Sequence, residues 1–295
     1  MSVNVGNLRY LDGNASREFF NSAENPAASP LARPIFCSNV VSVVPIMLQK
    51  CMWRGLAELA RGVGQLIFPN GCLICEQLEG DRTDFRHGLC SACLAAVTTD
   101  PHEACPWCAA TVGPHTDTSK GCPACREVAH GFDAAIRLGV YEGRLRDGIL
   151  RMKSQGGEAV AEMLGRVCGD VRGVRLRAVG ADFVVPVPLH WRRHFSRGHN
   201  QAAGIGRELA AGLGIQFATD LQRIRYTPQQ AQPSAAARRE NVKGAFRVRR
   251  GARLAGRTIL LIDDVMTTGS TVSEAARTLK ASGASQVVVV VLARR

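Results

Sequence analysis

Two kinds of apolar pattern alternate along the second half of the chain. Residues 132–141 read as a strand, and three further segments are apolar on both faces, as strands buried inside a sheet are: 182–189, 257–265 and 285–295. Between them, apolar residues recur at helical spacing in four segments, 143–153, 158–171, 198–214 and 270–283. Strands that alternate with amphipathic helices predict an α/β fold, with a parallel sheet covered on both sides.

The chain before residue 131 lacks this alternation. Residues 1–52 are rich in Asn, Ser, Ala and Pro and have no sustained period, which predicts a disordered N-terminal extension. A helical pattern follows from Trp53 to Ile67, and Met47 and Met52 just before it are alternative starting residues. We therefore predict three parts: the extension (1–52), a leading helix with a cysteine-rich segment (53–130), and the α/β domain (131–295).

The N-terminal region predicts neither a membrane span nor a secretory signal. Its longest apolar stretch, Val40–Leu48, is about ten residues long, whereas a span needs roughly 20. Asp12, Glu18 and Glu24 interrupt the first thirty residues, where a signal peptide would have an apolar core. The sequence therefore predicts a cytoplasmic protein.

The net charge of +12 is concentrated in the α/β domain. Residues 131–295 carry 27 Lys and Arg against 13 Asp and Glu, whereas residues 72–130 carry four against eight. Such a basic surplus favours an anionic partner, either the phosphates of a small ligand or a nucleic acid. A solvated basic surface is the alternative.

Eight of the eleven cysteines form four C-x-x-C pairs. Zinc prefers four thiolates in a tetrahedron, and each C-x-x-C turn supplies two of them, so the spacing predicts about two structural zinc ions. The pairs can combine in sequence or interleaved. Disulfides are disfavoured in a cytoplasmic chain, and CPWC lacks the surroundings of a redox dithiol. The predicted ligands are Cys72, Cys75, Cys90, Cys93, Cys105, Cys108, Cys122 and Cys125; Cys37, Cys51 and Cys168 match no spacing.

The strand at 257–265 runs into Asp263 and Asp264, and a loop of small and hydroxyl residues follows it. Ligands of parallel sheets bind at the carboxyl ends of strands, and the free amides of a helix beginning near Ser270 suit a phosphate. Carboxylates accept hydrogen bonds from sugar hydroxyls. The pattern therefore predicts a sugar-phosphate site formed by the two acids with Thr267, Thr268, Gly269, Ser270 and Thr271.

Two other interpretations of this stretch were weighed. A nucleotide-hydrolysing site would place magnesium on the acids, but it needs a G-x-x-x-x-G-K-[ST] loop, which the chain does not contain. A capped helix after a strand, with two exposed acids, is the purely structural alternative.

The stretch LLIDDVMTTGST (260–271) resembles the phosphoribosyl-pyrophosphate (PRPP) signature of type I phosphoribosyltransferases. Over roughly Leu66 to Arg295 the order of motifs resembles the ComF family. These motifs are FPNGCLIC with tandem C-x-x-C pairs, VVPVPLHWRRHFSRGHNQ, RIRYTPQQAQPSAAARRENVKGAF and the signature itself. The resemblance implies a double zinc ribbon followed by a type I phosphoribosyltransferase domain.

The resemblance also implies roles for individual residues. Asp263 and Asp264 would bind the ribose hydroxyls, and residues 267–271 the 5′-phosphate. PVPLH (186–190) resembles the pyrophosphate loop, and Mg²⁺ would accompany the pyrophosphate. The basic residues implied for the pyrophosphate are Lys153, His190, Arg192, Arg193 and Arg197. A mobile loop at 229–241 would cover the site with Gln230, Arg239 and Asn241. His199 stands where the family usually has an aromatic residue.

Two functions follow from the resemblance. One is transfer of a phosphoribosyl group from PRPP to an unidentified acceptor, a glycosyltransferase reaction that releases pyrophosphate. The other is the handling of single-stranded DNA, because family members are associated with natural transformation, so DNA or the DNA-uptake machinery is a candidate partner. The low aromatic content of 5% limits base stacking. No glutaminase nucleophile is evident, so amidotransferase activity is not predicted.

Overall fold

The computed structural model describes residues 71–78, 85–189, 199–225 and 235–295, all within one compact unit, 57–295. The predicted N-terminal extension, the leading helix, Cys37 and Cys51 lie outside the described residues. In the part of the chain that is described, no helix is long and apolar enough to cross a membrane.

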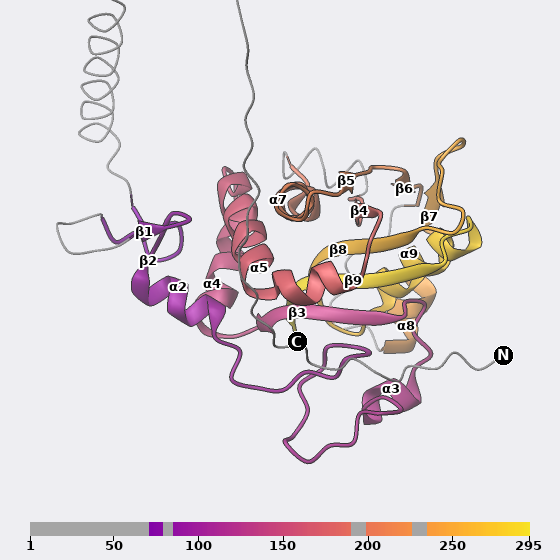
Figure 1. Cartoon of the computed structure of the whole chain (residues 1–295), viewed down its shortest axis with the longest axis horizontal. Helices are drawn as coiled ribbons and strands as arrows, with labels where there is room; N and C mark the ends of the chain where they lie inside the picture. The colour runs from indigo at the N-terminus through magenta and orange to yellow at the C-terminus, as the bar shows by residue number, and fades with distance from the viewer. Residues whose placement is uncertain (1–70, 79–84, 190–198, 226–234) are drawn as a thin grey trace, which may run out of the picture. The chain divides into compact units, whose positions relative to one another are not determined.

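A five-stranded parallel sheet forms the centre of the α/β region (Figure 1). Its strands lie in the order β3 (Ala134–Val140), β9 (Gln286–Arg294), β8 (Thr258–Met266), β4 (Phe183–Pro186) and β5 (Gln216–Phe217). In the middle strand, Leu261 lies beside Val289 of β9 and Val185 of β4. All three side chains are fully buried, because helices cover both faces of the sheet.

Three helices cover one face of the sheet and one helix covers the other, which confirms the predicted α/β fold. The first face carries α4 (Gly143–Met152), α5 (Glu158–Ala178) and α7 (Gln201–Leu213), and the second carries α9 (Ser270–Ala281) (Figure 1). Helix α5 runs to Ala178, beyond the predicted end near Val171, and its last turns bury Leu176 against the core.

A short antiparallel pair and a short helix were not predicted. Strands β6 (Leu221–Arg223) and β7 (Phe246–Val248) pair antiparallel, and Leu221 and Phe246 pack into the α9 side of the core. Helix α8 (Ala235–Val242) covers the second half of the segment 229–241 that was predicted as a mobile loop and ends one residue beyond it. Strands of three residues and a helix of eight give too little periodicity to be read from the sequence.

The cysteine-rich segment consists of two similar units, the first ribbon (71–98) and the second ribbon (104–127). In each, the amide of the first cysteine donates to a carbonyl five residues on: Cys72 to Gln77 and Cys105 to Ala110. In each, a short helix follows the third cysteine, namely α2 (Ser91–Thr98) and α3 (Pro123–Glu127). Strands β1 (Phe85–Arg86) and β2 (Leu89–Cys90) pair within the first ribbon.

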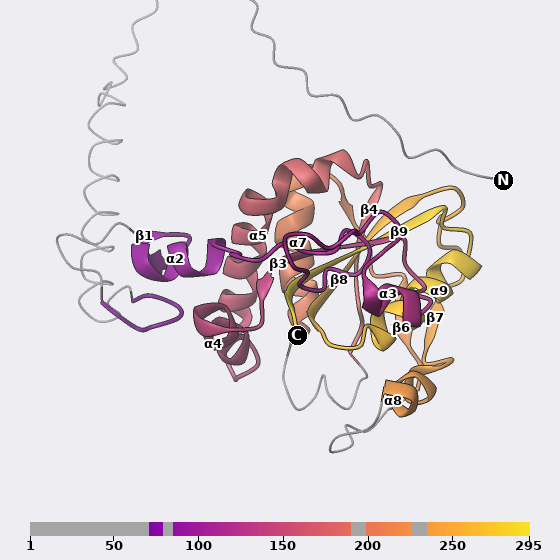
Figure 2. The ribbon, with the colours of Figure 1, turned by 90° about the horizontal axis from the view of Figure 1, so that it is seen from below.

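The two ribbons contact the α/β region differently. The first ribbon shares its apolar core with α4 and α5, beside which it lies in both views (Figures 1 and 2). The second ribbon has a small cluster of its own, around Cys105, Cys108 and Cys122. The segment between the ribbons is held by Arg137 of β3, whose buried guanidinium donates to Asp100 at 2.9 Å and to the Ala109 carbonyl at 3.0 Å.

Candidate functional site

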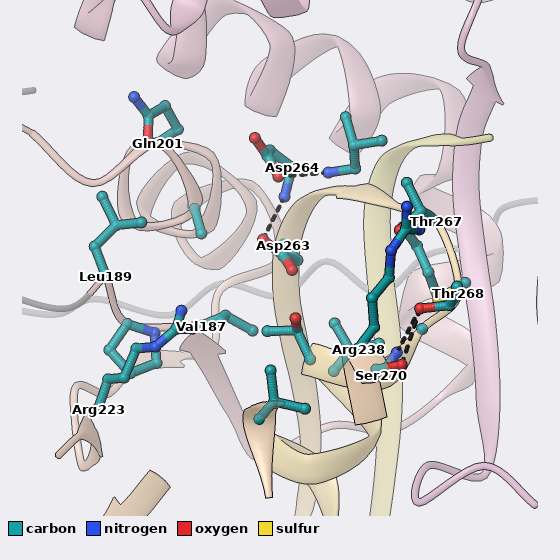
Figure 3. A pocket seen from close by; sticks show the side chains of 18 of the residues that line it. Val187, Leu189, Gln201, Arg223, Arg238, Asp263, Asp264, Thr267, Thr268 and Ser270 are labelled. Atoms are coloured by element: carbon teal, nitrogen blue, oxygen red, sulfur yellow. Dashed lines mark hydrogen bonds between the residues drawn. The ribbon is translucent and has the colours of Figure 1, made fainter. Parts of the chain in front are cut away.

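A cavity of about 410 Å³ opens where the neighbouring strands β4 and β8 end (Figure 3). The chain leaves β4 towards α7 on one face of the sheet and leaves β8 towards α9 on the opposite face. A parallel sheet leaves a crevice where successive connections diverge in this way, and ligands bind there. Asp263 and Asp264 lie between two walls, with Val187 and Leu189 on one side and Thr267, Thr268 and Ser270 on the other (Figure 3).

The two acids are half-buried and hydrogen-bonded to the loop that they begin. The Asp264 amide donates to Asp263 Oδ1 at 2.9 Å, and the Val265 amide donates to Asp264 Oδ1 at 2.6 Å. Lys153, the residue after α4, places its Nζ 2.9 Å from Asp264 Oδ2. Lys153, which the resemblance assigned to the pyrophosphate, therefore lies beside the acids.

Burial raises the pKa of Asp263 well above its ordinary range, and the neighbouring charge of Asp264 raises it further. The Asp264 amide and Lys153 oppose this shift without cancelling it. An acid that is held partly protonated in the absence of ligand gains hydrogen-bond donors when sugar hydroxyls bind, which favours its charged form. The raised pKa distinguishes Asp263 from an exposed surface acid.

We expect Asp263→Asn to stabilise the ligand-free protein. A carboxyl group whose pKa is higher in the folded than in the unfolded state takes up a proton on folding. The free energy of folding that it costs therefore grows as pH rises from about 3.8 towards the raised pKa. The neutral amide avoids that cost, and a gain of at least about 1 kcal/mol would raise Tm by roughly 2–4 °C for a domain of this size. Thermal unfolding between pH 4 and pH 8 measures the effect, which should be largest at the higher pH.

Asp182 lies beside the other end of β8 and provides a control, because its substitution by Asn should change the stability in the opposite direction. The Thr258 amide and Arg257 lower the pKa of Asp182, so Asp182→Asn should lose stability at neutral pH instead of gaining it. A Tm of Asp263→Asn that stays at or below that of the wild type at pH 8 would contradict the electrostatic interpretation.

The loop Thr267–Thr271, here called the phosphate loop, ends in the first residues of α9. Gly269 is the N-cap and has a φ of 74°, a conformation that side chains disfavour. Thr268 Oγ1 and Ser270 Oγ lie 2.9 Å apart (Figure 3). The first-turn amides of a helix have no intrahelical acceptor, and with these hydroxyls they make a site suited to a phosphate group.

The remaining predicted site residues do not all line the cavity. Asn241 lines the cavity, as the resemblance implied for the covering loop. Arg239 instead lines a separate hollow of about 20 Å³ that it shares with Thr268 and Ser270. Five predicted residues lie outside the described part of the chain: His190, Arg192, Arg193, Arg197 and Gln230.

Several polar residues that line the cavity were not among the predicted site residues. Gln201, the first residue of α7, is 2% exposed, and its Nε2 has no hydrogen-bond partner among the described residues. Arg223 of β6 and Arg238 of α8 present guanidinium groups to the same cavity (Figure 3). A buried amide without a partner costs free energy, so its place in a cavity wall points to a ligand. The only feature of the sequence that pointed to Gln201 was its position at the end of the motif VVPVPLHWRRHFSRGHNQ.

Contacts around the start of α7 tie the cavity wall together. Asn200 Nδ2 donates to the Val187 carbonyl at 3.2 Å, and His199 Nε2 lies 3.2 Å from the Met152 carbonyl. His199, which stands in the place of the family's aromatic residue, thereby joins the start of α7 to the end of α4. Lys153 follows immediately, so the same contact orients the lysine that pairs with Asp264.

The eight predicted cysteine ligands form two groups that follow the sequence and are not interleaved. Within each group the sulfur atoms lie within 4.8 Å of one another, and the shortest Sγ–Sγ distances are 3.6–3.8 Å. A tetrahedron with Zn–S bonds of about 2.3 Å has edges of about 3.8 Å, so each group could hold one zinc ion. The groups are Cys72, Cys75, Cys90 and Cys93, and Cys105, Cys108, Cys122 and Cys125.

Backbone amides favour the thiolate form of the first cysteine in each group. Burial raises the pKa of Cys72, but amides of Cys75, Cys90 and Ile74 outweigh it and bring the pKa to about 6. Amides in the second group lower the pKa of Cys105 to about 7 in the same way. Cys168 differs from these, because burial within α5 raises its pKa to about 12, as expected for a packing residue.

The sheet, the acids and phosphate loop at its switch point, and the two four-cysteine groups before it define a phosphoribosyltransferase-like domain preceded by a double zinc ribbon. Residues 200–295 match the family described as phosphoribosyl transferase domain. The chain is 34% identical over 212 residues to DNA utilization protein YhgH of Escherichia coli (strain K12), covering 70% of this chain and 90% of the relative. It is 28% identical over 226 residues to competence protein F of Haemophilus influenzae, covering 75% and 96%. The chain belongs to the ComF family, which includes these relatives.

Among solved structures, the chain is similar to glutamine PRPP amidotransferase from B. subtilis complexed with ADP and GMP. The two share 25% sequence identity with a TM-score of 0.32, over 46% of this chain and 27% of the amidotransferase chain. The protein therefore spans only about a quarter of that enzyme.

Proposed function

We propose that this protein binds PRPP with magnesium and transfers its phosphoribosyl group to an acceptor. The observation that carries the proposal is a single cavity in which two carboxylates lie between a helix N-terminus and a wall of nitrogen donors. In this proposal the acids accept the ribose hydroxyls and the phosphate loop holds the 5′-phosphate. The opposite wall, with the unpartnered Gln201 Nε2, faces the pyrophosphate.

In the transfer step, an acceptor atom with a lone pair would bond to C1 of the ribose. The bond from C1 to the pyrophosphate oxygen breaks, pyrophosphate leaves with the electron pair, and the acceptor's proton passes to solvent or to the leaving group. Positioning and charge stabilisation supply most of the catalysis in such a step. Lys153 would exchange its contact with Asp264 for one with the pyrophosphate when the hydroxyls occupy the acid.

Magnesium would stabilise the charge of the pyrophosphate as it leaves. Among the described residues that line the cavity, only Asp263 and Asp264 carry carboxylates that could ligate it, and the pyrophosphate oxygens would supply further ligands. Titration calorimetry of the purified protein with PRPP and magnesium tests the proposal. A protein that binds neither PRPP nor pyrophosphate under these conditions would refute it.

A second candidate function is the binding of single-stranded DNA. Its support is an exposed basic segment on and after β7, together with the DNA-related names of the relatives. Within the described residues, four exposed arginines on and after β7 have no carboxylate within salt-bridge distance, although the Arg247 guanidinium does donate to Gln222. They are Arg247, Arg249, Arg250 and Arg253. Unpaired guanidinium groups at this density suit a chain of phosphates.

If both ligands use neighbouring cations, saturating magnesium–PRPP should weaken DNA binding. Arg192→Ala with Arg193→Ala should weaken both ligands, whereas Arg249→Ala with Arg250→Ala should weaken DNA alone. DNA affinity should also fall with salt by about 0.7 log units per log unit for each phosphate neutralised. Fluorescence anisotropy of a labelled oligonucleotide measures all three effects.

Two results would relocate or exclude the proposed binding of single-stranded DNA. A DNA affinity that is unchanged by PRPP and by all four substitutions would place the DNA site elsewhere on the chain. No DNA binding at low salt would leave the transferase proposal standing alone.

A further inference from the structure

The segment that joins the second ribbon to β3 packs behind the phosphate loop. The imidazole of His130 lies against Gly269, where an added Cβ would be 3.7 Å from its Nδ1. The same ring stacks on Phe132, with centroids 4.7 Å apart. His130 therefore fills the space beneath the residue whose left-handed conformation opens α9.

Close backbone packing fixes this segment on α9. A Cβ added at Gly131 would lie 2.1 Å from the Ser273 carbonyl oxygen, so only glycine fits there. Arg277 of α9 donates to the Ala129 carbonyl at 3.2 Å. Movement of residues 129–131 would thus displace the first turns of α9, which include the end of the phosphate loop.

Met266, the residue just before the loop, marks a second connection. Its carbonyl accepts a hydrogen bond at 3.1 Å from the guanidinium of Arg294, at the end of β9. Ala109, which directly follows Cys108, is fully buried in the same apolar cluster as Met266. Arg294 therefore fixes the backbone at the point where the cluster that includes the second ribbon meets the loop.

We infer that His130 and Arg294 are positioning residues that couple the second cysteine group to the phosphate loop. Phosphate binding in the loop and metal retention by Cys105, Cys108, Cys122 and Cys125 then strengthen each other, because coupling between two sites is reciprocal. This inference rests on the proposed function, since it takes the loop to bind a phosphate group. In addition, the second ribbon helps to hold the phosphate loop in its binding conformation.

The reciprocal effect is measured by the release of zinc to a chromogenic chelator. Saturating magnesium–PRPP should slow the release of about one zinc per chain by fivefold or more. The zinc of the first ribbon is the internal reference, because that ribbon packs with α4 and α5, on the face of the sheet opposite α9. The Asp263→Asn/Asp264→Asn protein should show no protection, which separates binding in the site from weak metal binding by PRPP itself.

Substitutions test the two connecting residues separately. His130→Ala and Arg294→Met should each weaken PRPP binding by about tenfold while zinc content stays at about two per chain. His130→Phe should restore affinity, because the ring is needed for packing. Arg172→Met is the matched control: Arg172 also donates to strand carbonyls, those of Arg137 and Leu138, but does not line the cavity. Its loss should leave PRPP affinity unchanged, even if the melting temperature falls.

The outcomes distinguish this inference from the function on which it rests. Wild-type protein that binds PRPP without any change in zinc release would overturn the coupling and leave the proposed function standing. PRPP affinity that survives both His130→Ala and Arg294→Met would overturn the positioning roles. Wild-type protein that does not bind PRPP in calorimetry would overturn the proposed function itself.

Discussion

Replacing Asp263 and Asp264 together by asparagine is expected to abolish PRPP binding and to leave the fold intact. Each carboxylate would accept a charge-assisted hydrogen bond from a ribose hydroxyl, and each such bond contributes roughly 1.5–3 kcal/mol. Loss of both should cost about 3–6 kcal/mol, which is a hundredfold or more in affinity. The fold should survive because both side chains are at the cavity end of β8, beyond the fully buried Ile259–Ile262.

Calorimetry with magnesium–PRPP measures the loss, and circular dichroism checks the fold. Asp182→Asn is the matched control, because its carboxylate lies at the opposite end of β8 and accepts from the Thr258 amide at 2.8 Å. It should bind PRPP with wild-type affinity. Unchanged affinity in the double variant would show that the sugar binds elsewhere.

Removal of zinc is expected to unfold the two ribbons. The protein purified without added metal should contain about two zinc ions per chain, one for each four-cysteine group. Structural zinc supplies on the order of 10–16 kcal/mol of apparent folding free energy in small zinc fingers. The second ribbon has only a small apolar cluster to replace it. Elemental analysis, followed by hydrogen exchange of the metal-free protein, measures both effects.

The structure refines what a single substitution should do. Cys75→Ser should raise hydrogen exchange in residues 72–130 more than in the rest of the chain. It should also loosen α4 and α5, since Leu89, Cys93 and Val97 share their core. Cys125→Ser lies in the separate cluster and should spare those helices. A zinc content near zero in a protein whose ribbons remain protected from exchange would rule out the structural role.

Local patterns in the sequence were enough to predict the sheet and the centre of the candidate site. The strands at 257–265 and 285–295 are apolar on both faces, and that pattern forms only where helices cover both sides of a sheet. Asp263 and Asp264 lie in the last residues of one of these strands, so predicting the strand also predicted that they stand at its carboxyl end. The cysteine spacing likewise predicted two four-thiolate groups, because a C-x-x-C turn is a local structure.

Contacts between distant parts of the chain could not be predicted in this way. Only the tertiary structure shows that the cysteine pairs combine in sequence, because either combination satisfies the same spacing. The register of α8 decides that Arg238 lines the cavity while Arg239 lies along the smaller hollow. The burial of Gln201 in the cavity wall likewise depends on how α7 packs on the sheet.

The sequence by itself determined which residue types stand at the end of β8 and which thiols can share a metal, since both depend on neighbours within a few positions. The tertiary structure decided what surrounds them. It paired Lys153 with Asp264, and it placed His130 and Arg294 behind the phosphate loop. Those contacts join residues 28 to 139 positions apart, and packing of the whole domain selects them, so no local period in the sequence records them.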